Sequence, residues 1–169
     1  MAPSLEATRR LGLPRHDDED DTMKTQAIKT LFTTTGGYGA LALRLPVGLI
    51  LAAHGAQKLF GWFGGYGLSG TAQWLESIGL APGLLMALLA GGAEFFGGLA
   101  LMVGLLTRPA ALAAAFTMLV AIVSVHLGNG LFMANNGYEF ALALLAASVA
   151  LTLQGAGRLS LDGLVAKRM

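Results

Sequence analysis

Ionisable side chains interrupt segments of this chain that are otherwise apolar. They are Arg44, His54, Lys58, Glu94, His126 and Glu139. Acidic and basic groups held close together can give and take protons during a reaction. A carboxylate in hydrocarbon costs at least ~2.5 kcal/mol unless it is paired or protonated, so such a group is rarely there without a purpose. We therefore predict a polar site with two sets of residues. The catalytic set is Glu94, His54 and Lys58, and the substrate-binding set is Arg44, His126 and Glu139.

The first polar residues share one face of a helix. In the stretch ALRLPVGLILAAHGAQKLFGWFGG (42–65), Arg44, His54 and Lys58 fall within an arc of roughly 80° at about 100° per residue. Gly48 and Gly55 lie beside them, and such small residues let another helix approach closely. This pattern predicts a face turned toward a neighbouring helix and away from lipid.

A second segment supplies the expected partner. Glu94 lies near the middle of LLAGGAEFFGGLALMVG, with Gly91 and Gly98 on the same face. Its carboxylate is expected to meet Lys58 or His54. Of these two, His54 lies about 6 Å deeper along the helix.

The remaining candidates lie at segment ends. His126 closes one apolar segment and Glu139 opens the next, both at the outer boundary. Arg44 lies near the inner end, more than about a dozen ångströms from the others along the helix axis.

Each candidate also has a purely structural explanation. Arg44 and Lys58 can extend to the two headgroup layers. His126 and Glu139 can mark helix ends, where an acid near the N-terminus is stabilising. Glu94 can form a structural tie between helices. The sequence leaves both explanations open.

The composition identifies the elements that must hold these residues. Of 169 residues, 54% are hydrophobic and 12% are charged, against about 25% charged in soluble domains. The chain has no cysteine, which excludes disulfides and thiolate metal sites, and no metal site is predicted. No basic block resembles a nucleic-acid footprint, so nucleic acid is not an expected partner.

The apolar segments predict an all-α integral membrane four-helix bundle. They lie at about 39–60, 83–106, 109–127 and 138–155, each near the roughly 20 residues that cross a bilayer. Three parts are expected: a polar, disordered segment at 1–37, a transmembrane domain at 38–157, and a short polar tail at 158–169.

The lysines and arginines predict the orientation. They precede the first span, follow the last, and include Arg108 between the second and third, whereas the other two connections carry none beyond Lys58. Positive residues favour the cytoplasmic side, so both termini are expected there. The acidic N-terminus argues against a removable leader.

The order of these features resembles the DoxX family of small four-span bacterial membrane proteins. The similarity rests on LRLPVGLILAAHGAQKLFG, GGAEFFGGLALMVGLLTRPAAL and HLGNGLF followed by NGYEFALALL, and it covers about residues 39–155. The resemblance implies a multi-pass protein of the bacterial inner membrane. It further implies a role linked to quinones or oxidative stress, as a subunit of a quinone-dependent oxidoreductase.

Three hypotheses follow for function. In the first, a quinone binds between the spans, and a redox partner protein or bound cofactor supplies the electrons. In the second, the chain is a non-catalytic scaffold or small-solute carrier whose charges are structural. The third, a haem or metal site, rests on His54 and His126 alone and is less favoured. The expected surroundings are the lipid bilayer and either a redox partner or further copies of the chain.

Overall fold

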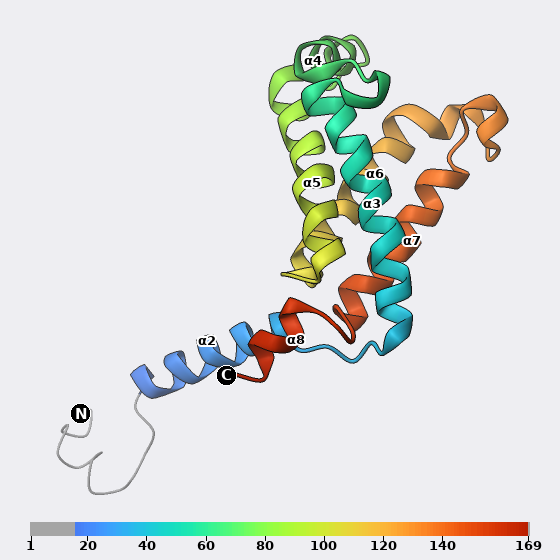
Figure 1. The fold of residues 1–169 in the computed structure, drawn as a ribbon. Helices are drawn as coiled ribbons and strands as arrows, with labels where there is room; N and C mark the ends of the chain where they lie inside the picture. The colour runs from blue at the N-terminus through green and yellow to red at the C-terminus, as the bar shows by residue number, and fades with distance from the viewer. Residues whose placement is uncertain (1–15, 169) are drawn as a thin grey trace, which may run out of the picture.

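The chain is built from helices around a bundle of four. The computed structural model describes residues 16–168, and within them there is no strand. The helices are α2 (His16–Phe32), α3 (Tyr38–Phe60), α4 (Gly67–Ser77), α5 (Gly83–Val103), α6 (Thr107–Ala121), α7 (Glu139–Gln154) and α8 (Leu161–Ala166). Short 3-10 and π turns join them (Figure 1). The predicted all-α class is therefore confirmed.

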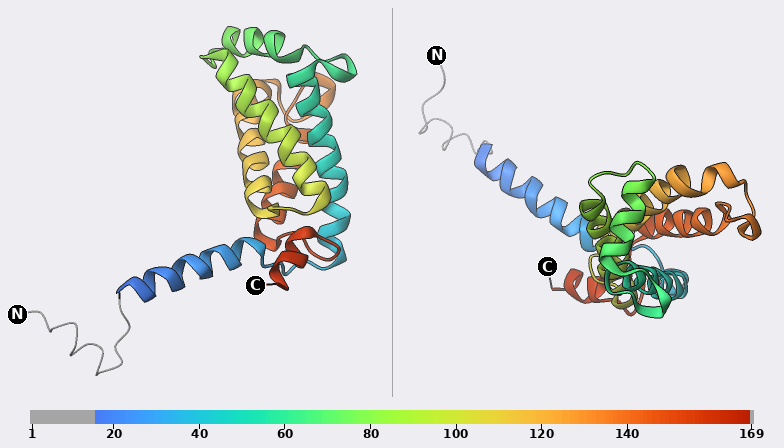
Figure 2. Two further views of the ribbon diagram at one scale, coloured as in Figure 1. Left: turned by 60° about the vertical axis from the view of Figure 1, so that its left-hand side comes forward. Right: turned by 90° about the horizontal axis from the view of Figure 1, so that it is seen from above.

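The long helices α3, α5, α6 and α7 pack side by side, with α5 between α3 and α6, and α7 against α6. Helix α4 crosses one end of this bundle, whereas α2 and α8 lie at the other end (Figures 1 and 2). We call the end with α4 the outer end and the end with α8 the inner end, following the orientation that the positive charges predict. Both ends of the described chain lie at the inner end.

Three helical stretches are long and apolar enough to cross a membrane. They are Tyr38–Phe60, Gly83–Val103 and Thr107–Asn129, which coincide with the first three expected spans. The fourth expected span corresponds to α7, a shorter apolar helix. Its 16 residues extend about 24 Å at 1.5 Å per residue, less than a ~30 Å hydrocarbon core. The crossing of the bilayer by α7 stays a prediction.

The N-terminal segment contains more order than the sequence suggested. Helix α2 occupies His16–Phe32, inside the segment that was expected to be disordered, and residues 1–15 lie outside the described residues. This stretch has neither glycine nor proline and contains good helix formers such as Lys, Gln, Ala and Leu. The helix propensity of this stretch is not evident from its high charge and low hydrophobicity, which are also typical of disordered segments.

Glycines bring α3 and α5 into backbone contact. A Cβ atom at Gly48 would come within 2.6 Å of the Gly98 carbonyl oxygen, and one at Gly98 would lie 2.5 Å from the Ala52 nitrogen. A Cβ at Gly55 would collide with the backbone of Phe95. The close approach predicted from these glycines is therefore present, and it fixes how the polar residues of the two helices meet.

The first testable prediction concerns orientation. Because the natural chain has no cysteine, single cysteines at the exposed positions Ser69 and Asn135 provide clean probes of the outer end. We expect an impermeant thiol reagent to label both in intact spheroplasts, and a cysteine at Lys24 only after lysis. Labelling of Lys24→Cys in intact cells, with protection of the other two, would reverse the orientation.

Candidate functional site

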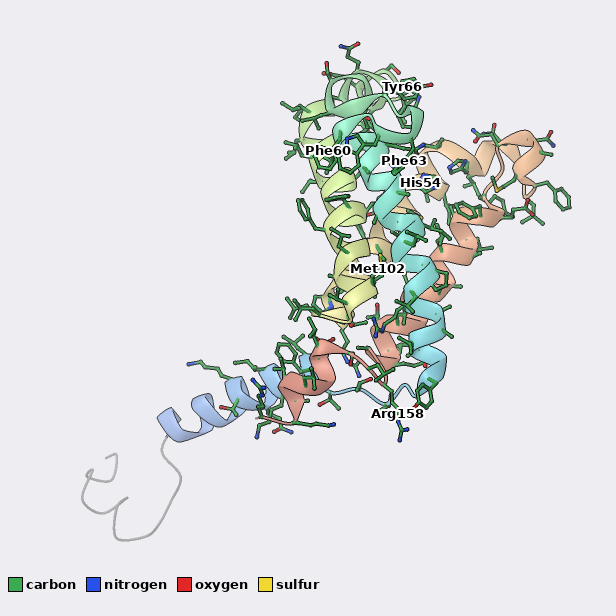
Figure 3. All side chains as sticks on the ribbon, viewed as in Figure 1. His54, Phe60, Phe63, Tyr66, Met102 and Arg158 are labelled. Carbon is green, nitrogen blue, oxygen red and sulfur yellow. The ribbon has the colours of Figure 1, made fainter. Side chains whose placement is uncertain are left out.

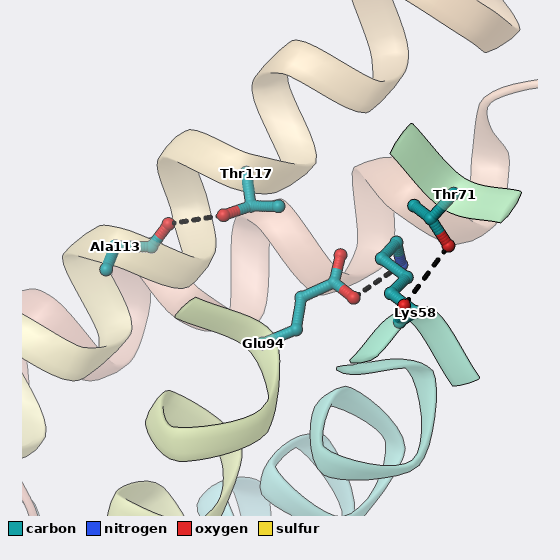
Figure 4. A network of polar contacts seen from close by, with 5 residues as sticks. All are labelled: Lys58, Thr71, Glu94, Ala113 and Thr117. Carbon is teal, nitrogen blue, oxygen red and sulfur yellow. Dashed lines mark hydrogen bonds and ion pairs between the residues drawn. The ribbon is translucent and has the colours of Figure 1, made fainter. Parts of the chain in front are cut away.

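An ion pair joins α3 to α5 in the outer half of the bundle. The Lys58 Nζ atom lies 2.5 Å from Glu94 Oε2, and the Glu94 side chain is only 2% exposed. Figure 4 shows the two side chains pointing toward each other from their helices. Of the two partners that the sequence offered to Glu94, the structure places Lys58 in direct contact.

The helix ends hold this pair in position. Lys58 lies in the last turn of α3, which ends at Gly61 with a left-handed backbone (φ 72°). A cation is stabilised there by the negative end of the helix dipole. Thr71, on α4, donates from Oγ1 to the Lys58 carbonyl oxygen at 3.2 Å, so α4 is fastened across this end of α3. The pair therefore lies beneath α4, close to the outer surface.

The pair has hydrogen-bonding capacity left over. An ammonium has three N–H donors, and within the described residues Lys58 uses one, toward Glu94 Oε2. The second carboxylate oxygen of Glu94 accepts no hydrogen bond from any described residue. Lys58 itself is 28% exposed. This arrangement can hold a proton and can offer a donor to a ligand that approaches Lys58.

His54 lies one helical turn inward from Lys58. Its imidazole is exposed on the bundle surface and packs at a tilt of 50° against the Phe140 ring of α7, with 6.0 Å between ring centroids. Figure 3 shows His54 in the same half of the molecule as Phe60 and Tyr66, with Arg158 at the opposite end. Within the described residues its ring nitrogens form no hydrogen bond, so both are available to a ligand.

His126 and Glu139 are engaged by the loop that connects α6 to α7. His126 Nδ1 lies 2.8 Å from the Asn136 carbonyl oxygen, and Glu139 Oε1 accepts from the Met133 N–H at 2.6 Å. His126 also ends the π-helical turn that begins at Ile122, a widened geometry that is frequent at functional sites. In the structure these two residues shape the outer loop, and neither contacts the Lys58–Glu94 pair directly.

Arg44 is enclosed by backbone carbonyls at the inner end. Its guanidinium donates to Leu101 (2.9 Å) and Met102 at the end of α5, and to Ala156 (3.1 Å) and Leu159 (2.6 Å) in the connection before α8. The side chain is 1% exposed. We expected Arg44 to bind substrate. That role would require these bonds to break, because they already engage its donors.

Asp162 is a buried charge that sequence reasoning missed. It is 1% exposed, and its two carboxylate oxygens accept from the Leu106 N–H at 2.7 Å and the Thr107 N–H at 2.9 Å, where α6 begins. The sequence signal was slight, because the residue lies in a polar tail and its partners are backbone groups 55 or 56 positions away. Asp162 thus caps α6 from the opposite end of the chain.

Within residues 16–168, no three His, Cys, Asp or Glu side chains cluster in a way that could hold a metal ion. The polar groups instead form two separate sets. The inner set of Arg44 and Asp162 is engaged by backbone groups, through four of the five guanidinium donors and both carboxylate oxygens. The outer set of Lys58, Glu94 and His54 retains free donors and acceptors and is the candidate site.

Membrane-length helices around a buried ion pair define a small integral membrane protein. The DoxX family model matches residues 39–127, and the chain belongs to this family. It is similar to "Putative oxidoreductase CatD" of Bacillus subtilis, with 37% identity over 129 residues, which are 76% of this chain and 88% of the relative. It is also similar to "Inner membrane protein YqjF" of Escherichia coli, with 34% identity, covering 77% of this chain and 94% of the relative.

No solved structure matches the chain. The family and these relatives make it a protein of the bacterial inner membrane, as the resemblance implied.

The second prediction concerns the inner end. Arg44→Lys and Asp162→Asn should each destabilise the bundle strongly, by about 3–5 kcal/mol, because each leaves buried backbone or charged groups without partners. Lysine cannot replace arginine here, since it lacks the planar fork of five donors. Thermal unfolding in detergent measures the loss. Arg158→Gln is the control, because the Arg158 side chain is exposed and lies over the Tyr38 ring, 5.2 Å from its centroid. A stable Arg44→Lys protein would contradict the prediction.

The third prediction concerns the ion pair. Lys58→Met should reduce stability more than Glu94→Gln, because Glu94 is nearly fully buried whereas a freed Lys58 can extend to the headgroups. The double variant should recover much of the loss, since no charge is left without its partner. Thermal unfolding of the three proteins tests this order. Glu76→Gln, at an exposed position on α4, is the control. Equal losses in both single variants would show that Lys58 is held as rigidly as Glu94.

Proposed function

We propose that this DoxX-family protein is a quinone-binding membrane subunit of an oxidoreductase, with the quinone ring held beside Lys58, Glu94 and His54. The observation that carries the proposal is a buried Lys–Glu pair with unused hydrogen-bonding capacity, next to an imidazole that no described residue engages. The printed name of one relative, "Putative oxidoreductase CatD", supports redox chemistry for this chain.

A quinone suits this site by its chemistry. It dissolves in the hydrocarbon that surrounds the helices, and its two carbonyl oxygens need hydrogen-bond donors when they bind. Lys58 Nζ has donors to spare, and His54 provides a second donor one turn deeper, on the surface next to α7. Small ligands are commonly oriented by a few such polar groups in an otherwise apolar setting.

The reaction would need two electrons and two protons to convert the quinone to the quinol. Glu94, Lys58 and His54 can supply protons to the two ring oxygens and recover them from the nearby outer surface. The chain has no cysteine and no dinucleotide fingerprint. The electrons would therefore come from a partner dehydrogenase that carries a reduced flavin. In this proposal the chain binds the quinone and moves protons.

A non-catalytic scaffold or carrier is the alternative. It is favoured by one observation, the direct 2.5 Å contact between Lys58 and Glu94, which by itself stabilises the packing of α3 on α5. The two functions predict different results for variants in which the charges of Lys58 and Glu94 are removed. A structural tie needs only a packed interface, whereas a quinone site needs the donor and the proton.

The fourth prediction tests the proposed quinone site. Purified protein should bind a short-chain ubiquinone or menaquinone analogue, and a photoreactive azidoquinone should label α3 or α7 near His54 and Phe140. Lys58→Met and His54→Phe should each weaken binding about tenfold, the loss of roughly 1.4 kcal/mol that one hydrogen bond can provide. The stability-recovered double variant at Lys58 and Glu94 should not bind.

Arg158→Gln serves as the control for quinone binding, because it removes a charge at the inner end and leaves the outer site intact. Cells that carry the double variant should lose resistance to quinone stress to the same extent as a deletion. Full resistance and unchanged quinone binding in the double variant would identify the pair as a structural tie and exclude the proposed site.

A further inference from the structure

A groove lies at the inner end of the bundle, away from the candidate site. Its volume is about 250 Å³, and it is lined by Leu105, Leu161, Leu164, Val165 and Arg168. It forms where α8 folds back beside the turn between α5 and α6. Apart from the arginine, its walls are entirely aliphatic, and neither the scaffold nor the quinone function uses it.

The groove lies just beyond the inner end of a helix that is long and apolar enough to cross a membrane. Leu105 comes two residues after the end of α5, one of the membrane-length helices. Leu106, Leu161 and Leu164 are 42%, 41% and 56% exposed. Contact with water at these aliphatic side chains is unfavourable. This end of the molecule is therefore suited to lie within the inner boundary of the membrane.

The charges around the groove are positive. Arg168 forms part of the lining, and Lys167 is its exposed neighbour in the chain. Within residues 155–168 the one acid is Asp162, which is buried and accepts from the N–H groups at the start of α6. It is therefore held away from Arg168 by its own bonds. An apolar groove with a cationic rim complements a molecule that has a hydrocarbon chain and an anionic head.

We propose that the groove binds one anionic phospholipid, with an acyl chain along its leucines and the phosphate at Arg168. Basic pockets beside transmembrane helices on the cytoplasmic side bind such headgroups. The lipid would press α8 against the bundle. Through α8 it would support Asp162, which caps α6, and the adjacent Leu159 carbonyl, which accepts from Arg44.

The experiment uses the full-length protein in detergent micelles doped with phosphatidylglycerol or phosphatidylcholine of identical acyl chains. Native mass spectrometry counts the lipids retained, and thermal unfolding reports their effect. The wild-type protein should retain one phosphatidylglycerol with about fivefold preference over phosphatidylcholine, because one cation is attracted to a net anionic headgroup more than to a zwitterionic one. Its unfolding temperature should rise by several degrees with phosphatidylglycerol alone.

Variants separate the groove from general charge effects. Arg168→Gln, at an exposed position, should fold normally and lose the preference, whereas Leu164→Gln should retain neither lipid. Lys24→Gln, which removes an exposed cation from α2, is the matched control and should behave as the wild type. Equal retention of the two lipids by the wild type, or an unchanged preference in Arg168→Gln, would overturn the proposal.

Two other occupants of the groove, inorganic phosphate and a second copy of the chain, would give different results in these measurements. If inorganic phosphate reproduced the stabilisation, the anion alone would be sufficient and the proposed lipid would be wrong. If Leu164→Gln changed the mass of the protein–detergent complex measured by light scattering, and left lipid retention as it was, the groove would be an interface between copies of the chain. Both outcomes would contradict the lipid proposal.

Discussion

A charge in hydrocarbon must find a partner, and this requirement organises the bundle. Arg44 meets the carbonyls at the end of α5, where the helix dipole is negative. Asp162 meets the N–H groups at the start of α6, where it is positive. Arg108 donates to the carbonyls of Thr152 and Leu153 near the end of α7. Each charged side chain thus forms hydrogen bonds with N–H or C=O groups that have no partner within their own helix. Each therefore also fixes the position of that helix end.

The two ends of the molecule meet this requirement differently. At the inner end the charged side chains bond to backbone, and little capacity is left for a ligand. At the outer end Lys58 and Glu94 bond to each other and keep free donors and an acceptor. Backbone contacts between α3 and α5, which Gly48, Gly55 and Gly98 permit, keep the pair in register. The stabilising contacts of the inner end and the proposed ligand site are therefore separated along the bundle axis.

The sequence predicted those features that depend on periodicity. The membrane-length helices, the glycine face and the meeting of Glu94 with a residue of α3 all follow from spacing along single helices. The partners of Arg44 and Asp162 could not be found in this way, because they are backbone groups distant in the chain. His126 and Glu139 were expected near the pair because they share its depth. The structure engages them with their own loop, whose turns carry no periodic signal. Whether the outer residues act on a substrate is a question that spacing cannot answer.

The dependence of α6 on Asp162 has a consequence for biosynthesis. The start of α6 lies 55 residues ahead of its cap, so during translation the third helix enters the membrane before the carboxylate that satisfies its N-terminus has been made. The inner end is completed only once residues 156–162 have also been made. Until then Arg44 lacks the Ala156 and Leu159 carbonyls as well. Residues 156–162 thus close the inner end of the bundle. A nascent chain that stalls before them leaves that end open to the proteins that recognise unfinished membrane proteins.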